Sequence, residues 1–583
     1  VIDVETNGLD PFNINQICGV GIGTLDRETY YFPFRHQQGG NLALKYQLGV
    51  IEFLNGVKTL IGYNIKFDLH FLVREGLVIT DQKLIDVIVM VRLTEPSEEK
   101  DLSLTKTIIR SYGESKAQYD IDTKKYLTKN KWSKDFSLAP IDVLGPYCEK
   151  DVEWTAALYN DRLQQIIQSR QEEVFELECK LTKVLYNMEN TGISIDTEYA
   201  RSTITKIQER QEQLTQQIFD EVGDFNINST QQLGEIMNNN GIFSPIQTPK
   251  GAQAWNEAAL VQINNPLAGL VRQYRALGKL FSTYLEPYLD RSVKHTSFCN
   301  WGTLTGRLSS REPNLQNIPR NHFKLSKVNL TDEERNIVRG RVNALIASKG
   351  GVPNLNLDDN VIDTWSFIGD ESFDEVDSTQ IAIRRFFSID DNHKQFKFYR
   401  QMAKAITFGT IYGIGSNKLA SQLGTTPKQA LEYKKKYFKG LKGSKDFFDS
   451  VVKAVSLRGW IKNRYGRIYR IPKNLGYKGV NYLVQGTSAD ILNERMIEIS
   501  SYLSTTKSRI LLQVHDEIIC EVHKDDLITV PEQIKNLMET NSLNIPLFID
   551  METCEPSWAT KKEFSSELTQ YVKDDIIDYI DWD

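Results

Sequence analysis

The sequence has no hydrophobic segment long enough to cross a membrane. Its unbroken apolar runs are short, such as the run from Val87 to Val91, whereas a spanning helix needs about 20 apolar residues. Cysteine is also scarce, with six residues scattered along 583 and no Cys-x-x-Cys pair. This pattern argues against a disulfide framework or a zinc ribbon and is typical of a reducing compartment. We therefore expect no membrane partner and a cytoplasmic location.

An overall excess of positive charge is absent too. The chain has 70 lysines and arginines against 76 aspartates and glutamates, and its net charge of −6 argues mildly against a nucleic-acid partner. The average hides a basic block, however, because twelve basic residues and only two acidic ones lie between Lys394 and Asp446. Such a block indicates a surface that faces phosphates, and a solvated helix face is the alternative.

The remaining composition is that of a globular protein, with 40% apolar and 25% charged residues. At about 150 residues per domain, the length predicts about four domains or subdomains. Residues 1–160 alternate short apolar strands with helical stretches, which predicts an α/β sheet domain. Residues 161–290 become helical with long charged stretches, and residues 300–583 mix strands and helices.

The first group of candidate site residues is acidic. Asp3 and Glu5 lie two apart on a predicted strand, so both carboxylates project from one face. Asp68 follows a second predicted strand, and Tyr147 and Asp151 lie four apart on a predicted helix. Four carboxylates and a tyrosine in this order fit a site that holds two hard cations on oxygen ligands. One metal would generate hydroxide, the other would stabilise the leaving oxygen, and the tyrosine would orient the attacking water.

This arrangement resembles the DEDDy class of 3′–5′ exonucleases, over residues 1 to about 160. The resemblance implies that Asp3, Glu5, Asp68 and Asp151 bind the metals and that Tyr147 is catalytic. Asp86 is a further acid nearby, for which a polar contact and a structural role both stay open.

A second group of candidate residues lies in the basic block. Arg400, Lys404, Phe408 and Tyr412 recur every four residues and form a stripe on one helix face. Two cations and two rings on one stripe can meet one nucleotide, the cations at its triphosphate and the rings at its base and sugar. Taken alone, the segment also fits an amphipathic helix whose aromatic residues are core.

Two separated aspartates accompany this stripe. Asp516 lies with His515 and Glu517 at a predicted hairpin tip between apolar strands, and Asp377 lies in DSTQIAIRR. Two such aspartates can bridge two Mg²⁺ ions, which orient a 3′-hydroxyl and neutralise a triphosphate during in-line displacement. The segments TGRLSS and PNLQNIP offer polar side chains for a sugar-phosphate backbone and for the minor groove.

With these motifs the chain resembles family-A DNA polymerases, the group that contains the bacterial DNA polymerase I enzymes, over nearly its whole length. The resemblance implies an α/β and α+β multidomain fold, in which an RNase H-like exonuclease domain precedes a right-hand polymerase. The implied domains are residues 1–160 (exonuclease), 161–300 (thumb), 301–390 (first part of the palm, with an extra segment at about 321–371), 391–480 (fingers) and 481–583 (second part of the palm).

The resemblance also implies roles for single residues in the polymerase half. Asp377 and Asp516 would bind metal, and His515 and Glu517 would support the primer terminus, while Lys404 would be catalytic. The implied nucleotide-binding residues are Arg400, Lys404, Phe408, Tyr412, Gln380 and Ala382. The implied DNA-binding residues are Arg307, Gln316, Asn317, Asn481 and Gln485.

Several positions depart from the family pattern. Ala382 replaces a glutamate that packs where a ribose 2′-hydroxyl would fall, Tyr477 replaces an arginine, and Glu375 adds an acid beside Asp377. These differences concern fine specificity and leave the reaction class unchanged.

We therefore predict a template-directed DNA polymerase that adds dNTPs to a primer by two-metal phosphoryl transfer and proofreads with a 3′–5′ exonuclease. We expect two Mg²⁺ ions per active site, with Mn²⁺ as an alternative, and a monomer that binds template-primer DNA and dNTPs. The compact size, the divergent motifs and the lack of a 5′-nuclease region suggest a phage or viral source, which would place the protein in the host cytoplasm. The alternative is a 3′–5′ exonuclease whose polymerase half serves mainly as a DNA-binding platform.

Overall fold

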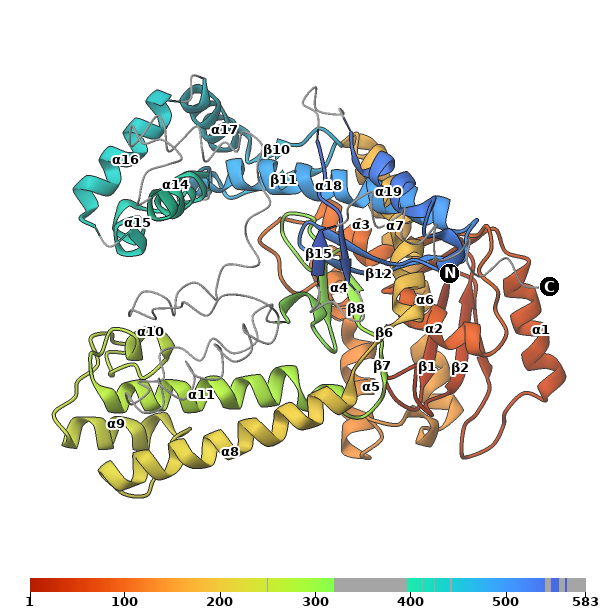
Figure 1. Ribbon diagram of the computed structural model, residues 1–583. Coiled ribbons are helices and arrows are strands. Elements are labelled where there is room, and N and C mark those ends of the chain that lie inside the picture. Colours follow the sequence, from red (N-terminus) through yellow and green to blue (C-terminus); the bar gives the residue numbers. More distant parts are fainter. Residues whose placement is uncertain are drawn as a thin grey trace, which may run out of the picture.

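The computed structural model of the chain describes residues 1–248, 250–318, 396–411, 413–423, 425–440, 443–540, 547–554 and 561–563. A sheet-containing N-terminal region lies on one side of the molecule, and two groups of helices extend on the other side (Figure 1). This mixture of sheets and helices confirms the predicted α/β and α+β fold class. Among the described residues, no helix has both the length and the apolar character that a membrane crossing requires.

The N-terminal region contains a three-stranded antiparallel sheet, in the order β1-β2-β3, and a parallel pair, β4-β5. The predicted alternation of short apolar strands with helices over residues 1–160 is confirmed. The elements are β1 (Ile2–Thr6), β2 (Ile17–Gly23), β3 (Thr29–Pro33), α1 (Leu44–Asn55), β4 (Thr59–Gly62), α2 (Ile65–Arg74), β5 (Lys83–Asp86), α3 (Val87–Thr94), α4 (Leu104–Tyr112), α5 (Gln118–Lys129) and α6 (Ile141–Gln168).

Helix α6 lies directly on strand β2, because glycines leave room for it. A Cβ atom on Gly21 would lie 2.6 Å from Cys148 Sγ, and one on Gly23 would lie 2.5 Å from Val152 Cγ1. Real Cβ atoms do not approach other heavy atoms so closely, so a larger residue at either position would have to displace the Cys148 or Val152 side chain of α6. Glycine inside a strand often marks such a close approach. The two glycines thus allow α6 to pack closely on β2, the strand next to β1.

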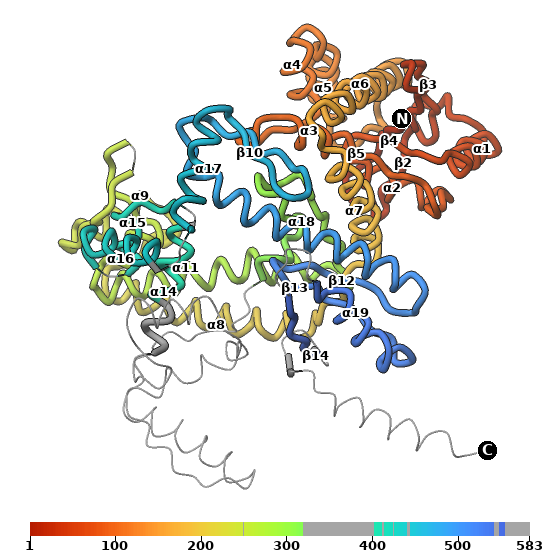
Figure 2. The backbone as a smooth tube through the Cα atoms, turned by 90° about the horizontal axis from the view of Figure 1, so that it is seen from above, coloured from red at the N-terminus to blue at the C-terminus, as the bar shows by residue number. Residues whose placement is uncertain are grey.

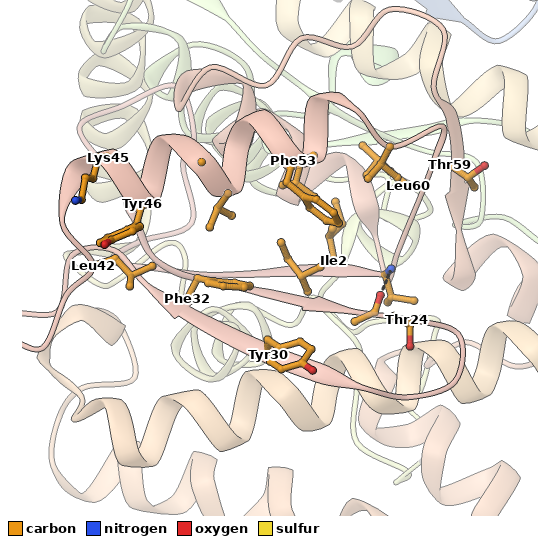
Figure 3. Close-up of a pocket in the computed structure, with 17 residues that line it drawn as sticks. Ile2, Thr24, Tyr30, Phe32, Leu42, Lys45, Tyr46, Phe53, Thr59 and Leu60 are labelled. Atoms are coloured by element: carbon orange, nitrogen blue, oxygen red, sulfur yellow. Dashed lines mark hydrogen bonds between the residues drawn. The ribbon is translucent and has the colours of Figure 1, made fainter.

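The opposite face of the sheet packs against α1 and α2. A mostly apolar cavity of about 770 Å³ opens there between α1 and the strands (Figure 3). Ile2, Phe32 and Leu60 line it from the strands, and Tyr46 and Phe53 line it from α1. Successive strand residues point to opposite faces, so the cavity at Ile2 lies across the sheet from the Asp3 side chain. It is therefore not part of the predicted carboxylate site.

A long helical stretch follows and confirms the prediction for residues 161–290. Helices α8 and α11 pack along each other, whereas α7 packs against α18 and β5. The expected thumb range of 161–300 therefore contains two separate packing units. The elements are α7 (Glu172–Thr191), β6 (Ile193–Ser194), α8 (Thr197–Val222), α9 (Thr230–Asn239), α10 (Glu257–Leu260), α11 (Pro266–Tyr284), β7 (Val293–Lys294), β8 (Ser297–Cys299) and β9 (Ser309–Arg311).

The last region joins a second helical group to a long helix, α18, and to the hairpin β12-β13 beside it (Figure 2). The extra segment expected at about residues 321–371 lies outside the described residues. The elements are α14 (Phe396–Ile411), α15 (Ser416–Leu423), α16 (Pro427–Gly440), α17 (Ser444–Arg458), β10 (Trp460–Lys462), β11 (Ile468–Arg470), α18 (Lys478–Leu503), β12 (Arg509–Val514), β13 (Glu517–Glu521), α19 (Val530–Met538), β14 (Glu552–Cys554) and β15 (Lys561–Glu563).

The loop after α3 ties the N-terminal region to α18. Glu98 accepts hydrogen bonds from the Tyr482 hydroxyl at 2.8 Å and from Lys478 Nζ at 3.1 Å. Next to it, the Ser97 backbone N–H donates to the Arg470 carbonyl at 3.1 Å. Helix α18 also carries Asn481 and Gln485, two of the predicted DNA-binding residues.

A buried glutamate on α7 joins the N-terminal region to the strands that follow the long helices. Glu189 Oε1 accepts from Lys66 Nζ at 2.5 Å and from the Phe298 N–H at 2.6 Å, and Oε2 lies 2.8 Å from His70 Nε2. The Glu189 and Lys66 side chains are each 3% exposed. Burial opposes ionisation of Glu189, yet Lys66 and His70 hold the pKa of this carboxyl below its ordinary value. The charge is therefore kept inside the protein by its partners from α2 and β8.

Removing this carboxylate should destabilise the protein strongly. Glu189→Ala leaves Lys66 buried without its counter-ion, and we expect a loss of about 3–5 kcal/mol in the free energy of unfolding, measured by urea denaturation. Glu176→Ala is the matched control, because Glu176 also lies on α7 and pairs with a lysine of the N-terminal region, Lys83, but is 50% exposed. We expect that control to lose less than about 1 kcal/mol. Equal losses would contradict the role assigned to Glu189.

Candidate active sites

Strand β1 provides the first two predicted carboxylates. Asp3 and Glu5 lie on the face that α6 covers, and Glu5 is buried. The pairing of β1 with β2 shifts by one residue directly after Glu5, and such bulges re-aim side chains beside functional sites. One oxygen of Asp3, one oxygen of Glu5 and Cys148 Sγ lie within 4.8 Å of one another. The two predicted carboxylates of β1 therefore lie close to each other.

Asp68 reaches the same place from α2. Its Oδ1 accepts a 3.0 Å hydrogen bond from the Val4 N–H, which lies between the two β1 acids in the chain. Helix α2 starts after Asn64, whose left-handed backbone (φ 62°) asparagine tolerates well. The Asn64 N–H donates to Asp86 Oδ1 at 2.8 Å, and Asp86 also caps α3 at Ile88. Asp86 thus holds the chain that positions Asp68, and it has the structural role that the sequence left open.

Helix α6 supplies the remaining two predicted residues, Tyr147 and Asp151, one turn apart. Tyr147 is buried and Asp151 is half-buried. Cys148, which follows Tyr147, donates from Sγ to Asp3 Oδ2 at 3.3 Å. Asp3 interacts electrostatically with Asp68, Asp151 and Tyr147. The structure therefore places all five residues of the first predicted group within electrostatic range of one another. Among the described residues, the group close enough to share one ion is Asp3, Glu5 and Cys148.

Helix α5 adds two contacts that the sequence analysis missed. The Tyr119 hydroxyl donates to Asp151 Oδ1 at 2.6 Å, and the Tyr147 hydroxyl donates to Asp120 Oδ1 at 3.1 Å. The segment QYDIDTKK carries no motif, and in the sequence it is typical of a solvated helix. The burial of Asp120 at 3% exposure is visible only once α5 packs on α6. No sequence signal short of that packing could have identified the pair.

The carboxylates are held in an environment that opposes their ionisation. Burial raises the pKa of Asp3 to about 6, with Cys148 acting in the opposite direction. Burial, and then the neighbouring negative charges, also raise the pKa of Glu5, Asp68 and Asp151 well above their ordinary values. The same causes raise the pKa of the Tyr147 phenol, so it stays protonated at neutral pH. Buried carboxylates that lie close together repel one another when they are ionised. A bound metal ion would relieve this repulsion.

The donor set fits divalent cations. Among the described residues, no lysine or arginine lies within ion-pair distance of Asp3, Glu5, Asp68 or Asp151. These four side chains offer hard carboxylate oxygens, which suit Mg²⁺ and Mn²⁺. The Cys148 thiol has its pKa raised by burial and by Asp3, so it is a neutral donor to that carboxylate and not a thiolate ligand.

The predicted hairpin tip of the second group is confirmed. Strands β12 and β13 pair up to Val514 and Glu517, and His515 and Asp516 form the loop between them. His515 has a left-handed backbone (φ 57°), and its carbonyl accepts from Gln513 Nε2 at 2.5 Å. Asp516 is exposed at the tip, whereas Glu517 is half-buried at the start of β13.

Two residues of the predicted nucleotide-binding stripe, Lys404 and Phe408, have described side chains, and both lie on α14. Ala403 and Ile406 are buried, whereas Lys404 is half-buried and Phe408 is 49% exposed. Phe408 is thus not a core residue, which removes the purely structural interpretation for this ring. The predicted residues that fall outside the described residues, or whose side chains do, are Asp377, Gln380, Ala382, Arg400 and Tyr412.

Two predicted DNA-binding residues lie on α18, and three lie near β9. Asn481 and Gln485 are half-buried one turn apart, and Asn481 Oδ1 has no hydrogen-bond partner among the described residues. Gln316 is buried, and its Nε2 donates to the Gln513 backbone at 3.1 Å and side chain at 2.7 Å. Its amide therefore supports β12 here and does not face solvent. Arg307 and Asn317, by contrast, are exposed.

The basic block is largely solvent-facing on the second helical group. Its exposed lysines are Lys418, Lys428, Lys435, Lys436, Lys439 and Lys445. Lys445 is 2.5 Å from Asp449 one helical turn away, whereas Lys434 donates to the Ile414 carbonyl. Exposure alone fits both a phosphate-facing surface and a solvated helix face.

Comparisons with known proteins bear on the whole chain. The family model for DNA polymerase family A matches residues 197–560. DNA polymerase I of Lactococcus lactis subsp. cremoris is 30% identical over 441 residues, which are 71% of this chain and 49% of that relative. DNA polymerase I of Chloroflexus aurantiacus is 26% identical over 602 residues, which are 95% of this chain and 60% of that relative. The chain thus spans about half to three fifths of the length of these relatives.

A solved structure extends the match to the fold. The POL domain of Pol1 from M. smegmatis, in complex with DNA primer-template and dNTP, matches with a TM-score of 0.68. The two are 18% identical, and the match covers 94% of this chain and 93% of that one. At this identity the likeness shows a common fold. Since the family model covers more than half of the residues and the fold agrees over nearly all of them, the chain belongs to DNA polymerase family A.

Proposed function

We propose that this chain extends a DNA primer by template-directed addition of dNTPs and trims mispaired 3′ ends with a separate 3′–5′ exonuclease site. Membership of DNA polymerase family A supports the first activity. The observation that carries the second is the convergence of Asp3, Glu5, Asp68 and Asp151 with Tyr147 on elements β1, α2 and α6. We also retain the expectations of a monomer and of a cytoplasmic location.

In the exonuclease site, the four carboxylates would hold two Mg²⁺ ions. Bound there, the ions supply an activated water and stabilise the leaving oxygen of the phosphodiester. Asp68 is kept in place by the Val4 N–H, and Asp3 by Cys148. The protonated Tyr147 hydroxyl would orient the attacking water, because a phenol is both a donor and an acceptor.

In the polymerase site, Asp377 and Asp516 would hold two metal ions, which would supply positive charge to activate the primer 3′-hydroxyl and to neutralise the triphosphate. Lys404 and Arg400 would bind the triphosphate as charge-assisted donors. Phe408 would pack on the sugar and base, with Gln380, Ala382 and Tyr412 completing the pocket. Template-primer DNA would lie across Arg307, Asn317, Asn481 and Gln485, with His515 and Glu517 at the primer terminus, while Gln316 would support β12 beneath them.

The two sites should be separable by mutation. Asp516→Ala should abolish primer extension with Mg²⁺ and dNTPs while leaving 3′ trimming of single strands, because each carboxylate set binds its own metals. Asp3→Ala together with Glu5→Ala should do the reverse, with losses of at least about a thousandfold in the affected activity when metal ligands are removed. Gel-based extension and trimming assays on the same preparations measure both activities.

The same two assays on the natural chain decide the alternative function. If the natural chain trims single strands but does not extend a primer, the polymerase half is a DNA-binding platform and the exonuclease interpretation stands alone. Loss of both activities in either variant, with unchanged thermal unfolding, would contradict two independent sites.

Stability should depend on pH and on Mg²⁺ together. The pKa of Asp3 is raised to about 6 from an ordinary value near 3.8, so between these pH values the folded state holds more protons than the unfolded chain. Stability therefore falls as pH rises through this range. Above it, Mg²⁺ should restore stability by about 2.7 kcal/mol at roughly 100 times its Kd. At pH 5 protons compete with the metal, so the midpoint of thermal unfolding should rise less.

The control for this experiment is Asp3→Asn with Glu5→Gln, which keeps the side-chain shapes but removes two charges. We expect a flatter pH dependence and a smaller Mg²⁺ effect in that variant. An equal Mg²⁺ effect in both proteins would place the stabilising metal elsewhere.

Phe408 should make the polymerase discriminate against dideoxynucleotides. A phenyl ring cannot give the hydrogen bond that a tyrosine hydroxyl offers to a substrate without its 3′-hydroxyl. Phe408→Tyr should therefore ease dideoxy incorporation by about fivefold or more, the worth of one hydrogen bond, in single-turnover measurements. Equal discrimination by both proteins would mean that Phe408 does not face the sugar.

A further inference from the structure

Helix α5 packs beside the carboxylate site, and two consecutive residues of this helix touch it. Tyr119 donates to Asp151 Oδ1 at 2.6 Å, and Asp120 Oδ1 accepts from the Tyr147 hydroxyl at 3.1 Å. Their partners lie four residues apart on α6, which places them on one helix face. Neighbouring positions on one helix thus hold both α6 residues of the proposed exonuclease site.

Asp120 is itself fixed from two sides. Its Oδ1 lies 2.7 Å from Lys124 Nζ one turn further along α5, and its Oδ2 accepts from the Thr105 hydroxyl of α4 at 2.7 Å. The Asp120 side chain is 5% exposed, whereas that of Lys124 is 55% exposed. The carboxylate is therefore an anchored acceptor, and it cannot turn away from Tyr147 without breaking bonds to two other side chains.

This anchoring determines which way the Tyr147 hydroxyl can act. A phenol has a single hydrogen and two acceptor lone pairs. Since the hydrogen is directed to Asp120, the lone pairs of the oxygen are left for an approaching water. A water that donates a hydrogen to Tyr147 keeps both of its lone pairs free, one for a metal ion and one for phosphorus, whereas a water that accepts from Tyr147 has already used one of the two.

We propose that Tyr119 and Asp120 are positioning residues of the exonuclease site, in which Tyr119 orients Asp151 for metal binding and Asp120 makes the Tyr147 hydroxyl an acceptor toward the attacking water. This inference rests on the proposed exonuclease activity and adds residues from α5 to it. Partners that orient metal-binding or catalytic side chains typically affect metal affinity or activity by about 10- to 100-fold.

A double-mutant cycle tests the Asp120 part. Asp120→Asn keeps the size of the side chain, but its amide can donate to Tyr147 and reverse the direction of the bond. We expect trimming of a single strand to show a kcat about tenfold lower with an unchanged KM, because Asp120 contacts Tyr147 and not DNA. In a Tyr147→Phe background the same change should have no further effect on kcat, since the hydroxyl that it directs is gone.

Metal binding tests the Tyr119 part without any turnover. Tyr119→Phe removes only the hydroxyl that holds Asp151, and we expect the Kd for Mn²⁺, measured by electron paramagnetic resonance, to rise about tenfold. The measurement uses a background with Asp377→Ala and Asp516→Ala, so that metal at the polymerase site does not contribute. Tyr112→Phe is the matched control, because Tyr112 on α4 donates to Asp161 on the same helix α6, ten residues beyond Asp151.

The outcomes are distinguishable. If the natural protein does not trim single strands at all, the proposed exonuclease fails. If it trims, but Asp120→Asn lowers kcat equally with and without the Tyr147 hydroxyl, or Tyr119→Phe binds Mn²⁺ as Tyr112→Phe does, the positioning roles are overturned. Should Asp120→Asn unfold, as judged by loss of primer extension, Thr105→Val removes one anchor of Asp120 and should lower kcat in the same direction by a smaller factor.

Discussion

A buried negative charge at Glu189 determines how the two halves of the chain are joined. An ion in the protein interior is tolerated only when other groups replace the water that it loses. Glu189 finds these groups in Lys66 and His70 of the N-terminal region and in the backbone of Phe298. Since α7 carries the glutamate and also packs against α18, the carboxylate site and the hairpin with Asp516 are placed in one framework. Neither half can shift without exposing or unpairing this charge.

A second contact joins the halves nearer to the residues proposed to bind DNA. Glu98 holds Lys478 and Tyr482 on α18, the helix that also carries Asn481 and Gln485. The helix proposed to contact template-primer DNA is thus bonded directly to the region proposed to excise errors. Half-exposed ion pairs contribute little to stability, so the value of this contact lies in the alignment of the two regions.

The sequence predicted the parts of the fold and the sites that follow from local patterns. The strands that begin at Ile2 and Thr59 are short runs rich in apolar residues. Tyr147 and Asp151 are four residues apart, which is the spacing of one helix face. The hairpin tip at Asp516 lies between two apolar strands. Contacts between distant segments were not predictable in this way. Tyr119 and Asp120 become visible as site residues only when α5 packs on α6, and Gln316 is buried because Gln513, far along the chain, accepts its amide. Local periodicity carries no information on such pairings.

The glycines of β2 have a consequence for how the carboxylate site is built. At Gly21 and Gly23 the strand offers only main-chain atoms to Cys148 and Val152 of α6. The separation between the acids of β1 and the residues of α6 is therefore set by the polypeptide backbone, whose dimensions are the same in every protein. A single methyl group at either glycine would act as a spacer between the two halves of the proposed exonuclease site. The missing side chains at Gly21 and Gly23 thus let the residues of α6 lie close to the acids of β1.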